Sequence, residues 1–111
     1  MNIPKRGDIV MANLNPVSGH EQKGFRPLLV ISHDDFNLKT RLIVICPITS
    51  KVKGTAFEVP FVGSQINGVV LTHQVRTIDL EARKVTVCDK VDDYCLQEVI
   101  RKVNLIINSH G

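Results

Sequence analysis

The sequence predicts a small α+β domain that is mainly β, a barrel of about six or seven short strands with a C-terminal helix. Two observations predict this fold. Before residue 90, short apolar runs alternate with glycine, proline and other turn residues, as in small all-β domains. After residue 92, apolar residues recur at the three- and four-residue spacing of a helix. The chain has 111 residues, so we expect a single domain over 1–111.

The predicted strands are apolar runs that end at turn residues. They cover residues 8–13, 27–32, 41–48, 56–62, 69–78 and 84–88. Pro47 has no N–H to pair and therefore predicts a bulge or an edge position near the end of the third run. Asn67-Gly68 is typical of a hairpin turn, and the strand that follows it can be interrupted at Thr72-His73.

The C-terminal segment predicts the main helix. Its apolar positions are Leu96, Val99, Ile100, Val103, Ile106 and Ile107. Asp92 or Asp93 would serve as the N-cap, because a carboxylate accepts a hydrogen bond from the first turn and suits the positive end of the helix dipole. The segment 34–37 is expected to form one further short helical turn.

Composition limits the classes of function only weakly. Lys and Arg total 14 and Asp and Glu total 11, and this net charge of +3 permits an anionic partner without requiring one. The chain starts with a polar, turn-like segment, so we expect a cytoplasmic protein with no membrane segment. A domain of this size buries a limited core, which favours an oligomer.

The three cysteines, Cys46, Cys88 and Cys95, have no paired CxxC spacing. Small apolar core thiols are the favoured interpretation, and a disulfide or a metal site is the alternative.

The segment 19–27 is the most unusual in composition. It places an imidazole, a carboxylate, an amide, an ammonium and a guanidinium between two glycines and a proline. This composition predicts a loop, which leads directly into an apolar strand. Acid–base and anion-binding groups at the start of a buried strand indicate a place where chemistry can be positioned.

Four segments match a known family in order and spacing along nearly the whole chain. They are Arg6-Gly7-Asp8-Ile9-Val10, the loop and strand Gly-His-Glu-Gln-Lys-Gly-Phe-Arg-Pro-Leu-Leu-Val-Ile at 19–31, Cys46-Pro47-Ile48-Thr49-Ser50, and Gly-Val-Val-Leu-Thr-His-Gln-Val-Arg-Thr-Ile-Asp at 68–79. Together they resemble the MazF/PemK/Kid family of toxin endoribonucleases. One such segment would be weak evidence, but four in register are specific.

The resemblance implies an SH3-like, CcdB-like β-barrel with a C-terminal helix that forms a homodimer. It also implies the toxin of a type II toxin–antitoxin system, neutralised by a MazE/PemI-like antitoxin. The implied activity is cleavage of single-stranded RNA at short sequence motifs without a metal or cofactor. In that reaction the 2′-hydroxyl attacks phosphorus, and the products are a 2′,3′-cyclic phosphate and a 5′-hydroxyl.

Such a reaction needs a base, donors for the charge that develops on phosphorus, and a proton for the leaving oxygen. Arg26 suits the phosphate, since its guanidinium binds two oxygens and keeps its charge, and the resemblance places the family's essential arginine here. The alternative is a structural pair with Glu21 or Asp8. The resemblance also places an important threonine at Thr49, whose alternative role is a strand-end bond to local backbone.

His20 and His73 are the candidates for proton transfer, because histidine titrates near neutrality. His73 departs from the family pattern. Relatives often have a carboxylate at this position, and one branch pairs an aspartate here with an arginine two residues earlier. This chain has Leu71 and His73 instead, so that assignment does not transfer. Each histidine could also be a solvated or edge residue without function.

Further residues are candidates for RNA contact. They are Glu21, Gln22, Lys23, Ser50, Lys51, Lys53, Phe57 and Gln74. The lysines would follow phosphates, and Phe57 would stack on a base or else belong to the core. Base recognition would depend on the loops at 49–54 and 63–68.

Two other functions fit the predicted fold. A CcdB-like, non-enzymatic toxin would poison DNA gyrase through its terminal helix, but that branch lacks the loop at 19–27. An SH3-like peptide-binding module would need an aromatic groove, and this chain has one tyrosine and no tryptophan.

Overall fold

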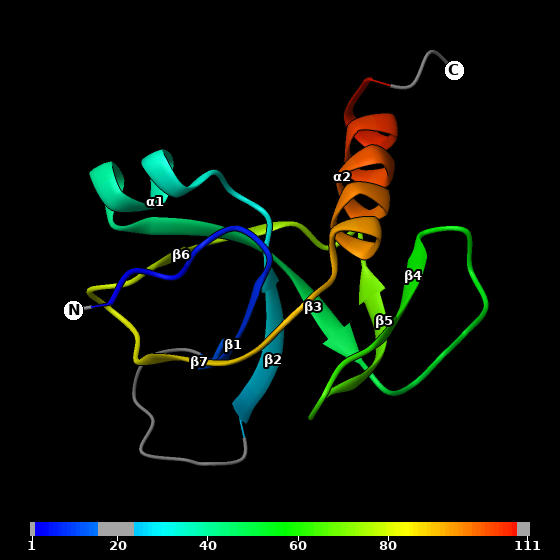
Figure 1. Ribbon diagram of the computed structural model, residues 1–111, viewed down its shortest axis with the longest axis horizontal. Coiled ribbons are helices and arrows are strands. Elements are labelled where there is room, and N and C mark those ends of the chain that lie inside the picture. Colours follow the sequence, from blue (N-terminus) through cyan, green and yellow to red (C-terminus); the bar gives the residue numbers. More distant parts are fainter. Residues whose placement is uncertain (1, 16–23, 109–111) are drawn as a thin grey trace.

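The computed structural model describes residues 2–15 and 24–108. Within these residues, seven strands and two helices follow one another (Figure 1). They are β1 (Asp8–Asn13), β2 (Phe25–Val30), α1 (Asp34–Thr40), β3 (Leu42–Thr49), β4 (Glu58–Val62), β5 (Asn67–Leu71), β6 (Arg76–Asp79), β7 (Val85–Lys90) and α2 (Asp93–Asn108). The predicted α+β class, mainly β with a C-terminal helix, is confirmed.

All seven strands form one antiparallel, curled sheet in the order β4-β5-β3-β2-β1-β7, with β6 also paired to β3. The central strand β3 pairs with β2 on one side. On its other side it pairs with β6 from Leu42 to Ile45 and then with β5 at Ile48 and Thr49. Pro47 lies between these two partners, so its missing N–H falls at a local edge, as its sequence position predicts.

Helix α2 covers one face of the sheet. Cys95, Val99 and Val103 are buried there against residues of β4 and β5 that include Val59 and Val70. Asp92, just before the helix, is the N-cap, because its Oδ1 accepts the N–H of Cys95 at 2.7 Å; this decides between the two predicted N-caps. A second group of buried residues, including Val10, Leu28 and Ile45, lies on the opposite face of the sheet.

The three cysteines are free thiols; Cys46 and Cys95 are buried, as the favoured interpretation predicts, whereas Cys88 is only half-buried. Burial raises the pKa of Cys46 to about 12. Burial, and secondarily the charge of Asp92, raises the pKa of Cys95 to about 11. Both thiols are therefore protonated and unreactive at neutral pH.

The hairpin between β4 and β5 corrects one prediction. Asn67 and Gly68 are paired residues of β5, opposite Val62 and Phe61, and the turn lies before them. Gly68 is required for a different reason: a Cβ there would collide with the carbonyl oxygen of Thr49, and its φ is +155°. The glycine allows β5 to approach β3 closely, which is why the turn signal is misplaced.

The other boundaries differ little from the predictions. The break at Thr72-His73 is confirmed, since β5 ends at Leu71 and β6 begins at Arg76. Helix α1 is longer than the single predicted turn and ends where Arg41 adopts a left-handed conformation, with φ 59°. Among the described residues, no helix is long and apolar enough to span a membrane.

Candidate active site

A hollow of about 670 Å³ opens where the ends of β2, β3 and β5 meet the loops around them. We call it the polar hollow. The residues that line it and bear on its chemistry are Arg26, Thr49, Ser50, Lys51, Gln65, Ile66, Asn67 and Gln74. All eight are indicated by the sequence, five as candidate site residues and three as part of the predicted recognition loop at 63–68, and they come from four separate parts of the chain.

Arg26 is the second residue of β2, opposite Ala12 of β1, and its side chain is exposed at the polar hollow. Within residues 2–15 and 24–108 its side chain makes no hydrogen bond or ion pair. The suggested pair with Asp8 does not form, because the Asp8 carboxylate instead accepts the N–H of Lys5 at 2.8 Å. Its guanidinium is therefore available to an anion as far as these residues are concerned.

The backbone that leads into Arg26 is tightly held. A Cβ on the buried Gly24 would collide with the side chain of Asn13, so the chain passes close against β1 at this point. Arg83 donates from Nη1 to the carbonyl oxygens of Asn13 and Asn15, at 2.5 and 2.8 Å, and fixes the end of β1. Arg26 thus extends from a rigid strand rather than from a free loop.

Thr49 ends β3 and is half-buried at the polar hollow. Its Oγ1 accepts the N–H of Lys51 at 3.1 Å, so the local bond that the sequence analysis names as an alternative is present. This bond uses one lone pair of the oxygen and leaves the hydroxyl proton free to donate. The local bond therefore orients the hydroxyl without preventing a contact with phosphate.

The loop after Thr49 is anchored by a residue that the sequence analysis missed. Glu58, the first residue of β4, is 7% exposed. Its carboxylate accepts the N–H of Lys53 at 3.2 Å and that of Gly54 at 3.0 Å. The Lys53 side chain is exposed but does not line the polar hollow, unlike Lys51. Alternation along β4 groups Glu58 with the exposed Pro60 and Val62, so no local pattern indicates this role.

The loop between β4 and β5 has a similar anchor, which was also missed. Asp89 of β7 accepts the Ser64 hydroxyl at 3.1 Å and the N–H groups of Gln65 and Ile66 at 3.0 and 3.2 Å. The N–H of Gln65 and that of the adjacent Lys90 contribute most to lowering the pKa of the Asp89 carboxyl. Nothing in the linear sequence links Asp89 to a loop more than twenty residues away.

Phe57 and His73 lie outside the polar hollow. Their ring centroids are 5.3 Å apart, and Phe57 is 46% exposed rather than part of the core. The structure therefore brings Arg26 and Thr49 together but places His73 beside Phe57, although the adjacent Gln74 lines the polar hollow.

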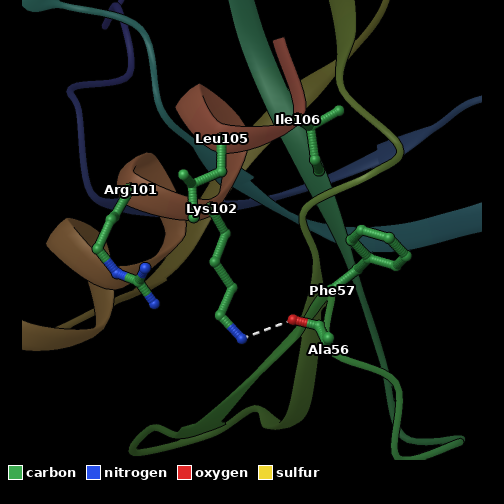
Figure 2. A pocket seen from close by; sticks show the side chains of 6 residues that line it. All are labelled: Ala56, Phe57, Arg101, Lys102, Leu105 and Ile106. Carbon is green, nitrogen blue, oxygen red and sulfur yellow. Dashed lines mark hydrogen bonds between the residues drawn. The ribbon is translucent and has the colours of Figure 1, made fainter. Parts of the chain in front are cut away.

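A second hollow, of about 660 Å³, lies between the end of α2 and the start of β4 (Figure 2). We call it the apolar hollow. Its lining residues are Ala56, Phe57, Arg101, Lys102, Leu105 and Ile106. Both cations are already paired: Lys102 Nζ donates to the Ala56 carbonyl at 2.6 Å, and Arg101 forms an ion pair with Glu98 at 2.5 Å.

The remaining predicted residues, His20, Glu21, Gln22 and Lys23, lie outside the described residues. Within residues 2–15 and 24–108, no group of three or more His, Cys, Asp or Glu side chains could hold a metal ion.

Comparison with known proteins decides the family. A family model described as PemK-like, MazF-like toxin of type II toxin–antitoxin system matches residues 5–107. The chain belongs to this family. The Endoribonuclease PemK of Escherichia coli is 37% identical to this PemK/MazF-like toxin over 108 residues, which cover 93% of the chain and 81% of the relative.

Two further relatives agree. The endoribonuclease toxin MazF of Escherichia coli K12 is 36% identical over 105 residues, 95% of each chain. A chain of the MazE–MazF crystal structure (form III) from Deinococcus radiodurans superposes with a TM-score of 0.86 at 32% identity, covering 98% of this toxin and 100% of that chain. The similarity spans almost the whole domain, including the strands that form the polar hollow.

Proposed function

We propose that this PemK/MazF-like toxin is an endoribonuclease that cleaves single-stranded RNA at short motifs without a metal ion. The observation that carries the proposal is the presence of Arg26 and Thr49 in one polar hollow, on the rigid ends of β2 and β3. The relatives named above are endoribonucleases. Membership of the family and the chemistry of the hollow thus support the same activity.

In the proposed reaction the 2′-oxygen forms a bond to phosphorus and the bond to the 5′-oxygen breaks. Arg26 would bind two phosphate oxygens and stabilise the charge that develops on them. Thr49 would donate a hydrogen bond from its hydroxyl to the same phosphate. Ser50, Lys51 and Gln74 line the polar hollow and would hold the flanking nucleotides. The products would be a 2′,3′-cyclic phosphate and a 5′-hydroxyl.

The proton must leave the 2′-hydroxyl and another must reach the 5′-oxygen. His20 and His73 are our candidates for these transfers. The contact of His73 with Phe57 supports a second role for this pair, in which their rings stack on a base of the RNA. Replacing each histidine by glutamine distinguishes the general base from a residue that only contacts RNA. The cleavage rate should no longer fall towards acidic pH in the variant that lacks the base, and should still fall in the other variant.

The test is incubation of the purified toxin with a long RNA in excess EDTA, followed by mapping of the cleavage sites and of the end groups. We expect cleavage at a short recurring motif with cyclic phosphate and 5′-hydroxyl ends. Loss of cleavage on chelation, or 3′-hydroxyl ends, would contradict the proposed chemistry.

The proposal extends to partners and location. We expect a homodimer, because Leu105, Ile106 and Ile107 at the end of α2 are 52%, 42% and 70% exposed and form an apolar surface that a second copy would cover. We also expect a MazE/PemI-like antitoxin, as in the Deinococcus complex, and a cytoplasmic location. No observation favours the alternative of a CcdB-like gyrase poison.

A further inference from the structure

The loop between β4 and β5 is held from a distant strand. The sheet order places the β4–β5 hairpin and β7 at opposite ends. Because the sheet curls, Asp89 of β7 reaches this loop and binds Ser64, Gln65 and Ile66. These contacts join the two ends of the curled sheet, and two of the three loop residues, Gln65 and Ile66, line the polar hollow.

An irregularity in β7 places Asp89 for this contact. Ile9 lies opposite Asp89, but Val10 lies opposite Val87, so Cys88 is an extra residue in the pairing with β1. A bulge of this kind bends a strand and redirects the side chains beside it. Without the extra residue, the side chain of Asp89 would point to the opposite face of the sheet.

Gly63 shows that the approach of Asp89 is close. A Cβ on Gly63 would lie 2.5 Å from Asp89 Oδ2 and would also collide with the ring of Phe61. The N–H of Gly63 is used within the loop, where it donates to the Ile66 carbonyl at 2.9 Å. The loop is therefore closed on itself and then fixed to β7 by one carboxylate.

We propose that Asp89 is a positioning residue that determines the RNA motif preference of this toxin by fixing the loop between β4 and β5. The inference rests on the proposed endoribonuclease function. Gln65 and Asn67 line the polar hollow, and their amide groups can each donate and accept hydrogen bonds at a base edge. An amide discriminates between bases only when its position is fixed.

The same geometry separates recognition from chemistry. Arg26 and Thr49 lie on β2 and β3, outside the loop that Asp89 holds. Loosening this loop should therefore relax the choice of base while leaving the phosphate chemistry largely intact. A residue that only stabilised the fold would slow cleavage of every motif by the same factor.

The experiment compares kcat and KM on short RNAs that differ by one base around the bond that the wild-type toxin cleaves. For Asp89→Ala we expect the preference for the best motif over the next to fall on the order of tenfold, the effect of one lost charge-assisted hydrogen bond. The change should appear mainly in KM. Asp89→Asn keeps one acceptor oxygen and should give an intermediate preference, and Ser64→Ala a smaller shift in the same direction.

Asp79→Ala is the matched control. Asp79 is also a strand-end aspartate whose carboxylate accepts a backbone N–H, that of Glu81 at 2.9 Å, but neither residue lines the polar hollow. This variant should keep the wild-type motif preference. Hydrogen exchange provides an assay that needs no RNA: the amides of Gln65 and Ile66 should exchange faster in Asp89→Ala.

The outcomes separate the two proposals. Suppose first that the wild-type toxin cleaves RNA. The proposed role of Asp89 is then wrong if Asp89→Ala keeps the wild-type motif preference, slows cleavage of all motifs equally, or behaves as Asp79→Ala does. In each of these cases the endoribonuclease function stands. If the wild-type toxin cleaves no RNA, the proposed function fails and this inference fails with it. Unchanged exchange at Gln65 and Ile66 would also overturn the inference, whatever the RNA result.

Discussion

The polar and apolar hollows have almost the same volume but differ in what they offer a ligand. In the polar hollow, Arg26 has no partner among the described residues. In the apolar hollow, Arg101 is paired with Glu98, and Lys102 with the carbonyl of Ala56. A cation that already has a partner must give it up to bind phosphate, so charge count alone does not identify an anion site.

The two hollows also differ in how their walls are held. Around the polar hollow, the carboxylates of Glu58 and Asp89 bind backbone N–H groups and fix two loops. Around the apolar hollow, Leu105 and Ile106 extend from the last turns of α2 and are about half exposed. The first is built for an ordered polar ligand, whereas the second presents a surface for apolar burial.

The largest expected effect separates the two arginines. Arg26→Ala should lower the cleavage rate on the order of 10² to 10³, the cost of losing one preorganised electrostatic stabiliser. Its melting temperature should stay near that of the wild type, because the side chain is exposed and bonds nothing among the described residues. Cleavage assays in EDTA, together with thermal unfolding, measure both effects.

Arg101→Ala is the control from the apolar hollow and should cleave RNA at nearly the wild-type rate, since its ion pair is exposed and contributes little. Equal loss of cleavage in both variants would show that the contrast between the hollows is wrong.

The next effect concerns assembly. Ile106→Asp should weaken the homodimer about a hundredfold, because a two-fold interface loses the burial of the same side chain twice, at about 1.5 kcal/mol each. Leu38→Asp, on α1, is a matched control, since Leu38 is 58% exposed and lies away from the apolar hollow. Sedimentation equilibrium at micromolar concentration distinguishes the two variants. A dimer that both substitutions leave intact would place the interface elsewhere.

A smaller effect is expected at Thr49. Thr49→Val removes the hydroxyl and keeps the shape, so cleavage should slow on the order of tenfold, as for one lost hydrogen bond to a charged group. Thr49→Ser keeps the hydroxyl and should retain most of the rate. If both variants cleave like the wild type, the Thr49 hydroxyl serves only its bond to Lys51.

Most of the fold could be predicted from the sequence, since apolar runs and turn residues are local signals. The error at Asn67-Gly68 is instructive. Glycine serves both tight turns and close backbone approach, and the second use depends on β3 lying beside β5, which no local pattern reveals.

The site was predictable only in part. The resemblance indicated Arg26 and Thr49, and the structure places them in one hollow. The anchors Glu58 and Asp89 escaped the sequence analysis because they bind backbone groups, which leave no side-chain motif. The contact of Asp89 further depends on a bulge at Cys88 and on the curl of the whole sheet.

The smallest expected effect is a pH dependence of stability at Asp89. Hydrogen bonds from the loop lower the pKa of this carboxyl below its unfolded value of about 3.9. The stability that it contributes is therefore fully present above about pH 4 and is lost as the pH falls further and the carboxyl becomes protonated. The melting temperature of the wild type should exceed that of Asp89→Asn at neutral pH, and the gap should close in acid.

Cys88 gives a second measure of the same carboxylate. Burial, and then the charge of Asp89, raises the pKa of the Cys88 thiol. Asp89→Asn should therefore lower that pKa and speed alkylation of Cys88 near pH 8, because the thiolate is the reactive form. The buried Cys46 and Cys95 serve as internal controls that stay unmodified in the folded protein. A stability gap that persists in acid, with unchanged Cys88 alkylation, would mean that the Asp89 carboxylate does not hold the loop through its charge.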